Sequence, residues 1–327
     1  MKELDTAKKV FYYAYKNNIY NEELSKMMLD FKDKRYIKLY ITHSKGIDKD
    51  YFLDFILSDD DPRYIYNVWF DNDEFVSRSL MFIKRLVSLN SKKYVGLLLY
   101  NLQIVKGIYI DECIELEKKY FELNDVHEID DMIKMSFEKS RSQYNIDSTG
   151  FSPKCYKGHD GQIPCLIVCH ISNMYEKILH NFYDKEMEVS SHFVIGRKGE
   201  IKQVVSLEDS AWCNGTSMNE ESDVYYKFST NKYVNSNKKN ANYFTYSIEH
   251  ESMDGSLTEE EYKSTIKVMK QIIDYLKEKY DYDFIIDDEH IIGHNAVNPI
   301  VKTKCPGPKF PFNRIINDLR EYYNKKI

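Results

Sequence analysis

The chain has 327 residues, of which 43% are hydrophobic and 30% are charged, and its formal net charge at pH 7 is -6. This length is sufficient for two ordinary domains, each with its own core. The modest charge, divided about evenly between the two halves, excludes the bulk basicity typical of a nucleic-acid-binding domain, so we expect no nucleic-acid partner.

The sequence also lacks the patterns of membrane and secretory proteins. It has no run of about 18 uncharged apolar residues that would predict a membrane span. The first residues lack the apolar core of a signal peptide, so we expect synthesis in the cytoplasm without one. The six cysteines do not follow the spacing of a disulfide framework, which agrees with a reducing compartment.

Residues 1–145 are predicted to form an all-α domain. Only one of the seven prolines, Pro62, lies in this half, and residues that interrupt helices are otherwise few. Apolar side chains recur at helical spacing in residues 24–31 and 80–87, and more loosely in residues 132–137. We expect about five to seven helices, packed as a bundle or as an array of helix pairs. No internal period is clear enough to predict a solenoid.

The aromatic residues of this half could line a carbohydrate surface, but aromatic side chains at helical spacing are more often part of a core. This half does not indicate a function by itself. The residues concerned are Phe11, Tyr12, Tyr13, Tyr15, Tyr64, Tyr66, Trp69 and Phe70.

Residues 146–162 are polar, rich in Ser, Gly and Pro, and are predicted to be a linker. The remaining residues, 163–327, alternate between strand and helix patterns, which predicts an α/β domain with a mixed central sheet flanked by helices. One helix has a clear start, because Thr258 and Glu261 form a capping-box pattern. The predicted strands are 163–169, 192–195, 201–205, 244–251 and 288–292, and the predicted helices are 173–183, 258–280 and the segment after residue 311.

Three metal-ligand side chains lie at the ends of predicted elements in this domain. His170 follows the first strand, His294 follows the last strand, and Cys305 lies on the next loop. All three can converge if these two strands are neighbours in the sheet. Two histidines and one cysteine, with a fourth position open to water, are typical of a catalytic zinc site, since structural zinc sites are closed by four protein ligands.

Five segments of the second half resemble, in the same order, motifs of a known enzyme family. That family is the zinc-dependent N-acetylmuramoyl-L-alanine amidases of the type-2 amidase and peptidoglycan recognition protein superfamily, which includes many phage endolysins. The resemblance covers about residues 160–325. The segments are IVCH (167–170), SSHFVIGRKGEIKQVVSLEDSAWCNG (190–215), YSIEHES (246–252), SLTEEEYKS (256–264) and IIGHNAVNPIVKTKCPG (291–307).

The resemblance implies that the three residues above bind zinc and that Glu249 is the catalytic acid. Because a strand alternates its faces, Glu251 shares the face of Glu249 and is its main competitor, with His250 behind it on the other face. Amide hydrolysis at neutral pH needs a stronger nucleophile than water, which a zinc ion supplies. A nearby carboxylate can accept the water proton and pass it to the leaving nitrogen.

Some positions depart from the family pattern. Many relatives have a lysine where this chain has Thr303, and either Lys302 or Lys304 could reach the oxyanion instead; Lys302 is slightly favoured. Ser191 occupies a position where some relatives use a catalytic tyrosine, which shifts weight to Glu249.

The resemblance also implies a set of groove residues. Trp212 and Asn242 match positions that contact muropeptide, although core packing explains the tryptophan nearly as well. His192 matches a family histidine that is not a ligand and is structural or groove-lining. Cys213 stands where a histidine is commoner.

These expectations combine into a two-domain cell-wall hydrolase that acts on bacterial peptidoglycan, cutting between muramic acid and the L-alanine of the stem peptide. An origin as a phage or prophage endolysin released by a holin, or as a lysis-type bacteriocin, fits the missing signal peptide. The usual endolysin order, with the catalytic domain first, does not fit. The alternatives are a non-hydrolytic peptidoglycan-recognition module, and a toxin or regulatory protein whose helical half docks on a protein partner.

Overall fold

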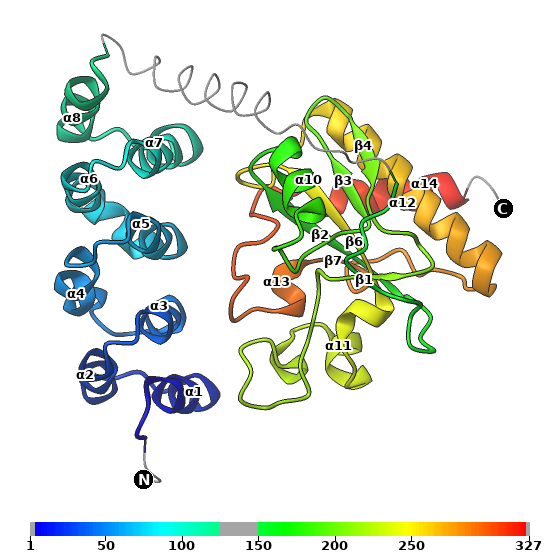
Figure 1. Cartoon of the computed structure of the whole chain (residues 1–327), viewed down its shortest axis with the longest axis horizontal. Helices are drawn as coiled ribbons and strands as arrows, with labels where there is room; N and C mark the ends of the chain where they lie inside the picture. Colours follow the sequence, from blue (N-terminus) through cyan, green and yellow to red (C-terminus); the bar gives the residue numbers. More distant parts are fainter. Residues whose placement is uncertain (1–3, 124–149, 325–327) are drawn as a thin grey trace. The chain divides into compact units, whose positions relative to one another are not determined.

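The computed structural model describes residues 4–123 and 150–324 of the chain (Figure 1). These residues form two compact units, one before and one after the intervening segment. The first unit is helical, and the second contains a mixed sheet with flanking helices, so the predicted fold class is confirmed. The helix predicted in residues 132–137 lies outside the described residues, and the proposed domain boundaries stay a prediction.

The first unit contains more helices than we expected. Its described part has eight α-helices, because short segments such as α4 escaped the periodicity analysis. The helices are α1 (Ala7–Asn17), α2 (Glu22–Phe31), α3 (Lys34–His43), α4 (Leu53–Leu57), α5 (Pro62–Asp71), α6 (Ser79–Ser88), α7 (Lys92–Tyr100) and α8 (Asp111–Phe121). Short 3-10 or π turns join some of them, namely η1 (Lys49–Phe52), η2 (Asp73–Arg78) and η3 (Asn101–Val105).

Side-chain caps explain where several of these helices begin. Thr6, Asn21 and Asp33 each accept a hydrogen bond from a backbone N–H in the first turn of the following helix. Asp61 does the same for α5, whose first residue is Pro62. Such caps satisfy N–H groups that have no partner within the helix, and proline is favoured at the first position.

The helices of the first unit form an array of helix pairs. Along one column α1 packs on α3, α3 on α5, and α5 on α7 (Figure 1). These four helices begin at Ala7, Lys34, Pro62 and Lys92, so the structure repeats at intervals of roughly 30 residues. The array is therefore periodic, although the sequence shows no clear repeat.

Five of the eight aromatic side chains singled out in this half are buried in its core, namely Phe11, Tyr12, Tyr64, Tyr66 and Trp69. Phe11 is fully buried, and Trp69, which is 1% exposed, donates a hydrogen bond from Nε1 to Ser79 Oγ at 3.0 Å. Tyr13 is an exception, with 37% of its surface exposed. The core interpretation of these residues therefore holds for the larger part of the set.

The second unit is built on a five-stranded sheet with the order β4-β3-β6-β2-β7. Four of the five strands run parallel to one another, namely β3, β6, β2 and β7. The fifth, β4, pairs antiparallel with β3 in the predicted hairpin. The strands are β2 (Leu166–Ser172), β3 (Phe193–Ile195), β4 (Ile201–Gln203), β6 (Thr245–Glu251) and β7 (Ile291–Gly293). The strand β2 has the predicted length but lies three residues later in the chain, so His170 lies within it and not after it.

Helices cover both faces of this sheet. Alternate strand residues such as Tyr246 and Ile248 pack against α12 (Glu259–Tyr280) and α14 (Phe312–Asn324). On the opposite face, Val194 packs against α10 (Tyr175–Tyr183). The predicted capping box at the start of α12 is present, since Thr258 accepts from Glu261 N and the Glu261 side chain accepts from Thr258 N.

Part of the predicted linker is packed onto the second unit. The two-residue strand β1 (Cys155–Tyr156) pairs antiparallel with β5 (Ser210–Ala211). His159 is buried, and its ring lies within hydrogen-bond distance of Leu207 O and Ser210 Oγ.

The long polar loop expected between residues 214 and 242 carries short helical segments. These are η4 (Tyr226–Phe228), α11 (Lys232–Asn237) and the start of η5 (Ala241–Phe244). Within the described ranges, no helix combines the length and apolarity needed to cross a membrane.

Candidate metal centre

Parallel strand pairing brings three of the predicted site residues to one edge of the sheet. In the pairing of β2 with β6, His170 lies opposite Glu249. In the pairing of β2 with β7, Cys169 lies opposite Gly293, and His294 follows at the start of α13 (His294–Val297). The first and last strands are therefore neighbours, as the convergence of the ligands requires.

The loop that carries Cys305 is held close to these strand ends. The backbone N–H of Asn295 donates to Cys305 O at 2.9 Å. A Cβ at Gly293 would lie 2.5 Å from Pro306 Cδ, and Gly307 adopts a φ of +102° against the backbone of Asp254. Glycine at these two positions therefore permits the close approach of the loop to β7 and to residues after β6.

His170, His294 and Cys305 form a compact cluster. One ligand atom from each lies within 4.8 Å of the others, and the two imidazole rings have centroids 4.3 Å apart. Only 3% of His170 and 8% of His294 are exposed. The three side chains can thus converge on one ion without a large movement of the backbone.

Burial sets the protonation of these groups. It lowers the pKa of His170 to about 3 and that of His294 well below its ordinary value, so both imidazoles are neutral and able to bind a metal. Burial raises the pKa of Cys305 to about 12. Cys305 is therefore a thiol before a metal binds and must lose its proton to become a ligand.

Glu249 adjoins the cluster from β6. Its Oε2 lies 4.0 Å from His170 Nδ1. Burial raises the pKa of this carboxyl to about 7, partly opposed by the positive charge of Lys302. A carboxyl that titrates near neutral pH can both accept and donate a proton under working conditions.

A second thiol reaches the cluster from the loop after β5. Cys213 Sγ lies 3.4 Å from His170 Nε2 and 3.8 Å from His170 Nδ1. Ligand atoms of His170, Cys213 and Glu249 also lie within 4.8 Å of one another. The sequence singled out Cys213 as a departure from the family pattern but did not place it beside the ligands.

Comparison with known families identifies the domain that contains this cluster. Residues 160–308 match the family described as N-acetylmuramoyl-L-alanine amidase (Amidase_2). The C-terminal half is a type-2 amidase domain. No curated protein sequence matches the chain.

Four chains of known structure resemble the amidase domain at low overall similarity. A selenomethionine derivative of AmpD has 23% identity and a TM-score of 0.39, over 52% of this chain and 92% of that chain. The amidase LysC from Clostridium intestinale URNW has 19% identity and a TM-score of 0.33, over 52% and 93% of the two chains. The endolysin amidase LysCS from the same organism has 19% identity and a TM-score of 0.33, over 52% of this chain and 91% of that chain.

The candidate groove residues of the amidase domain differ in their surroundings. His192 is 1% exposed; its Nδ1 accepts from Ser247 N at 3.0 Å, and Nε2 lies 3.1 Å from Asp209 O. Of the two roles considered for His192, this arrangement favours the structural one. Asn242 is also buried, and its Oδ1 accepts from the backbone N–H groups of Cys213 and Asn214 at 3.2 and 2.7 Å.

Trp212 has a buried hydrogen-bond donor. Its ring packs against Tyr156 with a centroid distance of 5.6 Å. Its Nε1 is buried and has no hydrogen-bond partner among the residues that the structure describes. A buried indole N–H without a partner is unfavourable, so a bound molecule that accepts from it would be stabilised.

Lys302 has an electrostatic effect on the cluster. Its charge lowers the pKa of His170, Glu249 and Cys305. Lys302 is therefore a candidate to stabilise negative charge at the site.

The two competitors of Glu249 have other contacts. Glu251 Oε2 accepts from Arg197 N at 3.0 Å, at the turn of the hairpin. His250 points to the opposite face, where its Nε2 lies 3.1 Å from Thr265 Oγ1 of α12. The predicted alternation of faces is thus observed, and Glu249 is the member of the three beside His170.

An orphaned polar atom tests whether these residues suit a metal. Asn214 Oδ1 is buried and has no hydrogen-bond partner of standard geometry within the described part of the chain. The Asn214 side chain raises the pKa of the His170 imidazole against the larger effect of burial. A buried carbonyl oxygen without a partner is unfavourable unless a bound group satisfies it. Two neutral imidazoles and a thiol are the donor types that zinc prefers, so the cluster fits a zinc ion.

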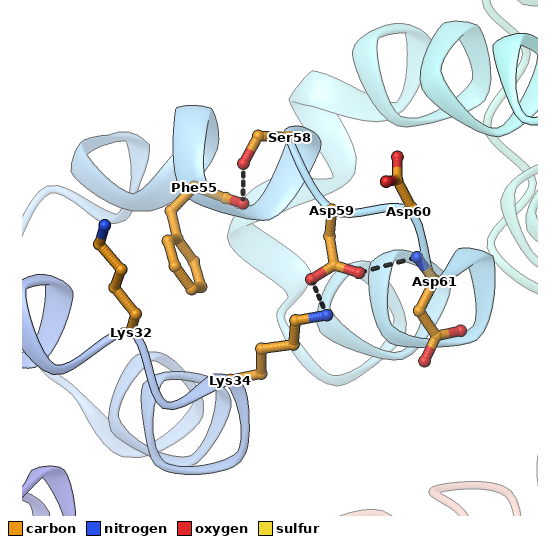
Figure 2. A pocket seen from close by; sticks show the side chains of 7 residues that line it. All are labelled: Lys32, Lys34, Phe55, Ser58, Asp59, Asp60 and Asp61. Atoms are coloured by element: carbon orange, nitrogen blue, oxygen red, sulfur yellow. Dashed lines mark hydrogen bonds and ion pairs between the residues drawn. The ribbon is translucent and has the colours of Figure 1, made fainter.

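The helical unit has an open cavity of 580 Å³ that contains none of the predicted site residues. Figure 2 shows its lining, where Lys34 Nζ pairs with Asp59 Oδ2 at 2.5 Å and Asp61 N donates to Asp59 Oδ1 at 2.7 Å. Because its acidic groups are engaged within the protein, this cavity is best explained as a gap between neighbouring helix pairs. The lining residues are Lys32, Lys34, Phe55, Ser58, Asp59, Asp60 and Asp61.

Proposed function

We propose that the amidase domain hydrolyses the bond between N-acetylmuramic acid and L-alanine in bacterial peptidoglycan, with zinc held by His170, His294 and Cys305. The observation that supports this proposal is the buried cluster of these three side chains beside Glu249. The membership of the domain in the amidase family gives the reaction class.

When bound, zinc would act as a Lewis acid and lower the pKa of a water molecule toward roughly 7. The residues of the chain prepare the site for it. His170 and His294 are neutral because they are buried. The thiolate of Cys305 would reduce the electrophilic character of the metal compared with a third histidine, which makes additional stabilisation of the oxyanion valuable.

Glu249 is the residue we assign to proton transfer. Its raised pKa of about 7 allows it to take a proton from water and return it to the leaving nitrogen. Lys302 supplies positive charge, which lowers the pKa of Glu249 and of Cys305. The buried Nε1–H of Trp212 is free to donate to an acceptor of the substrate. Asn242 fixes the loop that follows Trp212 by accepting from Asn214 N.

Two conservative substitutions on one strand face test this assignment. With zinc bound, Glu249→Gln should lose on the order of a hundredfold or more in the release of free amino termini from purified peptidoglycan. Glu251→Gln is the matched control, because Glu251 lies on the same face but accepts a hydrogen bond from Arg197 N. It should keep most of the activity. Full activity of Glu249→Gln, or loss confined to Glu251→Gln, would overturn the assignment.

The biological setting follows from the same proposal. We infer an endolysin or lysis-type bacteriocin that reaches the wall after holin action or lysis, with residues 1–145 binding the wall or a protein partner. A peptidoglycan-recognition module without turnover is the alternative. That alternative predicts a purified protein almost free of zinc, whereas the proposed enzyme contains about one zinc ion per chain.

A further inference from the structure

Three aromatic side chains form a continuous cluster next to the metal centre. The ring centroid of Tyr156 lies 5.6 Å from that of Trp212 and 5.1 Å from that of Tyr243. We call these three side chains the aromatic shelf. Trp212 is followed by Cys213, whose Sγ lies 3.4 Å from His170 Nε2. The aromatic shelf therefore begins one residue from a side chain that contacts a candidate metal ligand.

Tyr156 comes from a segment that precedes the residues matching the amidase family. It lies on β1 opposite Ser210 of β5, and Trp212 lies two residues beyond Ser210, a diagonal position that an aromatic side chain can reach. Two residues before Tyr156, the buried Lys154 donates from Nζ to Asn181 O at 3.0 Å. The fold of the domain therefore sets the position of Tyr156 in the aromatic shelf.

The aromatic shelf is accessible to a ligand. Tyr156 is 37% exposed, and both Trp212 and Tyr243 are partly exposed. The other tryptophan of the chain, Trp69, is 1% exposed and belongs to the core of the helical unit. Tyrosine and tryptophan side chains that stay partly in water are enriched at binding surfaces, because each combines an apolar ring with a polar group. A partner with an apolar face could therefore cover the aromatic shelf.

The charged groups around the aromatic shelf are paired with one another. Lys239 Nζ lies 2.8 Å from Asp160 Oδ2. Burial raises the pKa of the Tyr243 hydroxyl, and the charges of Asp160 and Lys239 shift it in opposite directions, so both lie near this ring. One residue past β1, Lys157 Nζ pairs with Asp209 Oδ2 at 2.9 Å. These pairs offer donors and acceptors with balanced charge, which suits a neutral hydroxylated ligand better than a stem peptide with its carboxylates.

We propose that the aromatic shelf binds a sugar ring of the glycan strand that carries the scissile bond. This inference rests on the proposed function, which brings the muramic acid to the metal centre. One face of a pyranose ring consists of C–H groups that can stack on aromatic rings. The hydroxyl and acetamido groups at its edge can bond to the charged pairs around the aromatic shelf. Tyr156 is thus a residue that selects substrates by their glycan and not by their peptide.

Titration of the full-length protein with a tetramer of N-acetylglucosamine tests the aromatic shelf without the reaction, since the tetramer has no amide bond to L-alanine. Tryptophan fluorescence should change on binding, because Trp212 lies in the aromatic shelf whereas Trp69 is buried. We expect Tyr156→Ala to bind the tetramer about tenfold more weakly than the wild type, since one stacking ring is lost. Tyr156→Phe keeps the ring and should bind as the wild type does.

A second tyrosine of the same domain is the matched control. Tyr322 is also partly exposed, but it lies on α14, which covers the sheet face of Ile248 and not that of Glu249. Tyr322→Ala should bind the tetramer with the wild-type affinity. A wild type that does not bind the tetramer, or equal affinities for Tyr156→Ala and the wild type, would overturn the sugar site. Binding of a sugar-free stem peptide that depends on Tyr156, without binding of the tetramer, would overturn it in favour of a peptide site.

Hydrolysis by the same variants separates this inference from the function on which it rests. With soluble glycan strands that carry stem peptides, Tyr156→Ala should raise KM severalfold and change kcat less, because the sugar contact is made equally in the ground state and the transition state. An unchanged KM would contradict the sugar site while leaving the proposed function intact. No turnover by the wild type would instead overturn the proposed function, and binding of the tetramer would still decide the sugar site.

Discussion

At the scale of single residues, burial determines what each group in the amidase domain can do. It keeps His170 and His294 neutral, raises the pKa of Glu249 to about 7, and keeps Cys305 protonated until a metal binds. The same residue types on an exposed loop would behave as ordinary surface groups. The chemistry of the site is therefore a property of its position in the sheet as much as of its composition.

Glu261 gives a pH-dependent stability that can be measured apart from the metal. It is fully buried at the start of α12, and burial raises the pKa of its carboxyl from 4.5 to about 8, with Arg197 lowering it and the charge of Glu251 raising it. The folded state therefore holds this proton more tightly than the unfolded state. Its contribution is present below about pH 4.5 and is lost as pH rises through about 8.

The free energy of unfolding of the wild type should fall between pH 5 and pH 8 because of this group. In Glu261→Gln, which has no titrating carboxyl, the fall should be smaller by on the order of 2–4 kcal/mol. Urea unfolding at the two pH values measures this difference. Glu260→Gln, which changes the exposed neighbouring side chain, is the control and should follow the wild type. Parallel pH profiles of Glu261→Gln and the wild type would contradict the shifted pKa.

The proximity of some candidate residues could be predicted from the sequence and that of others could not. The three candidate ligands and Glu249 lie in short motifs whose order along the chain resembles that of the family, and the structure brings them together. Cys213 could not be placed beside His170, because their proximity depends on how the loop after β5 folds over β2. The hydrogen bonds of His192 likewise come from Ser247 and Asp209, which are distant in sequence.

At the scale of elements, the close contact between β7 and the Cys305 loop is the critical feature. An added methyl group at Gly293 would lie 2.5 Å from Asn295 Oδ1 and from Pro306 Cδ. We expect Gly293→Ala to displace this loop and to weaken zinc binding by on the order of 10- to 100-fold, as is usual for changes beside metal ligands.

Competition with a chelator measures the zinc affinity of this variant. Gly215→Ala is the matched control, because its methyl group would meet its nearest neighbour, Asn242 Nδ2, at 3.4 Å. That substitution should change the affinity little. Equal zinc affinities for Gly293→Ala and the wild type would show that the Cys305 loop can adjust freely, and would contradict the tight contact between this loop and β7.

Features that depend on residues close in sequence were predicted well, and features that depend on contacts between distant segments were predicted poorly. The capping box of α12 and the hairpin of β3 and β4 were predicted, because each depends on residues within a few positions of one another. An array of helix pairs was one of the two arrangements expected for the first unit, but its periodicity was not predicted, since the repeat is one of shape and not of residue identity. The end of β2 was missed because pairing with β6 extends it past His170.

At the scale of the whole molecule, the chain joins a helical array to an amidase domain. The fold class was predictable because proline, glycine and apolar periodicity differ between the halves. A role for the first half was not predictable, since five of its eight candidate aromatic side chains are buried in its own core. A wall-binding or partner-binding function for that half stays a prediction.

The most direct test of the central claim is mass analysis of peptidoglycan digested by the full-length protein, with and without a chelator. We expect stem peptides with a free L-alanine amino terminus and glycan strands with unsubstituted muramic acid lactyl groups, formed only without the chelator. Cleavage at another bond, or the same products in the presence of the chelator, would contradict it.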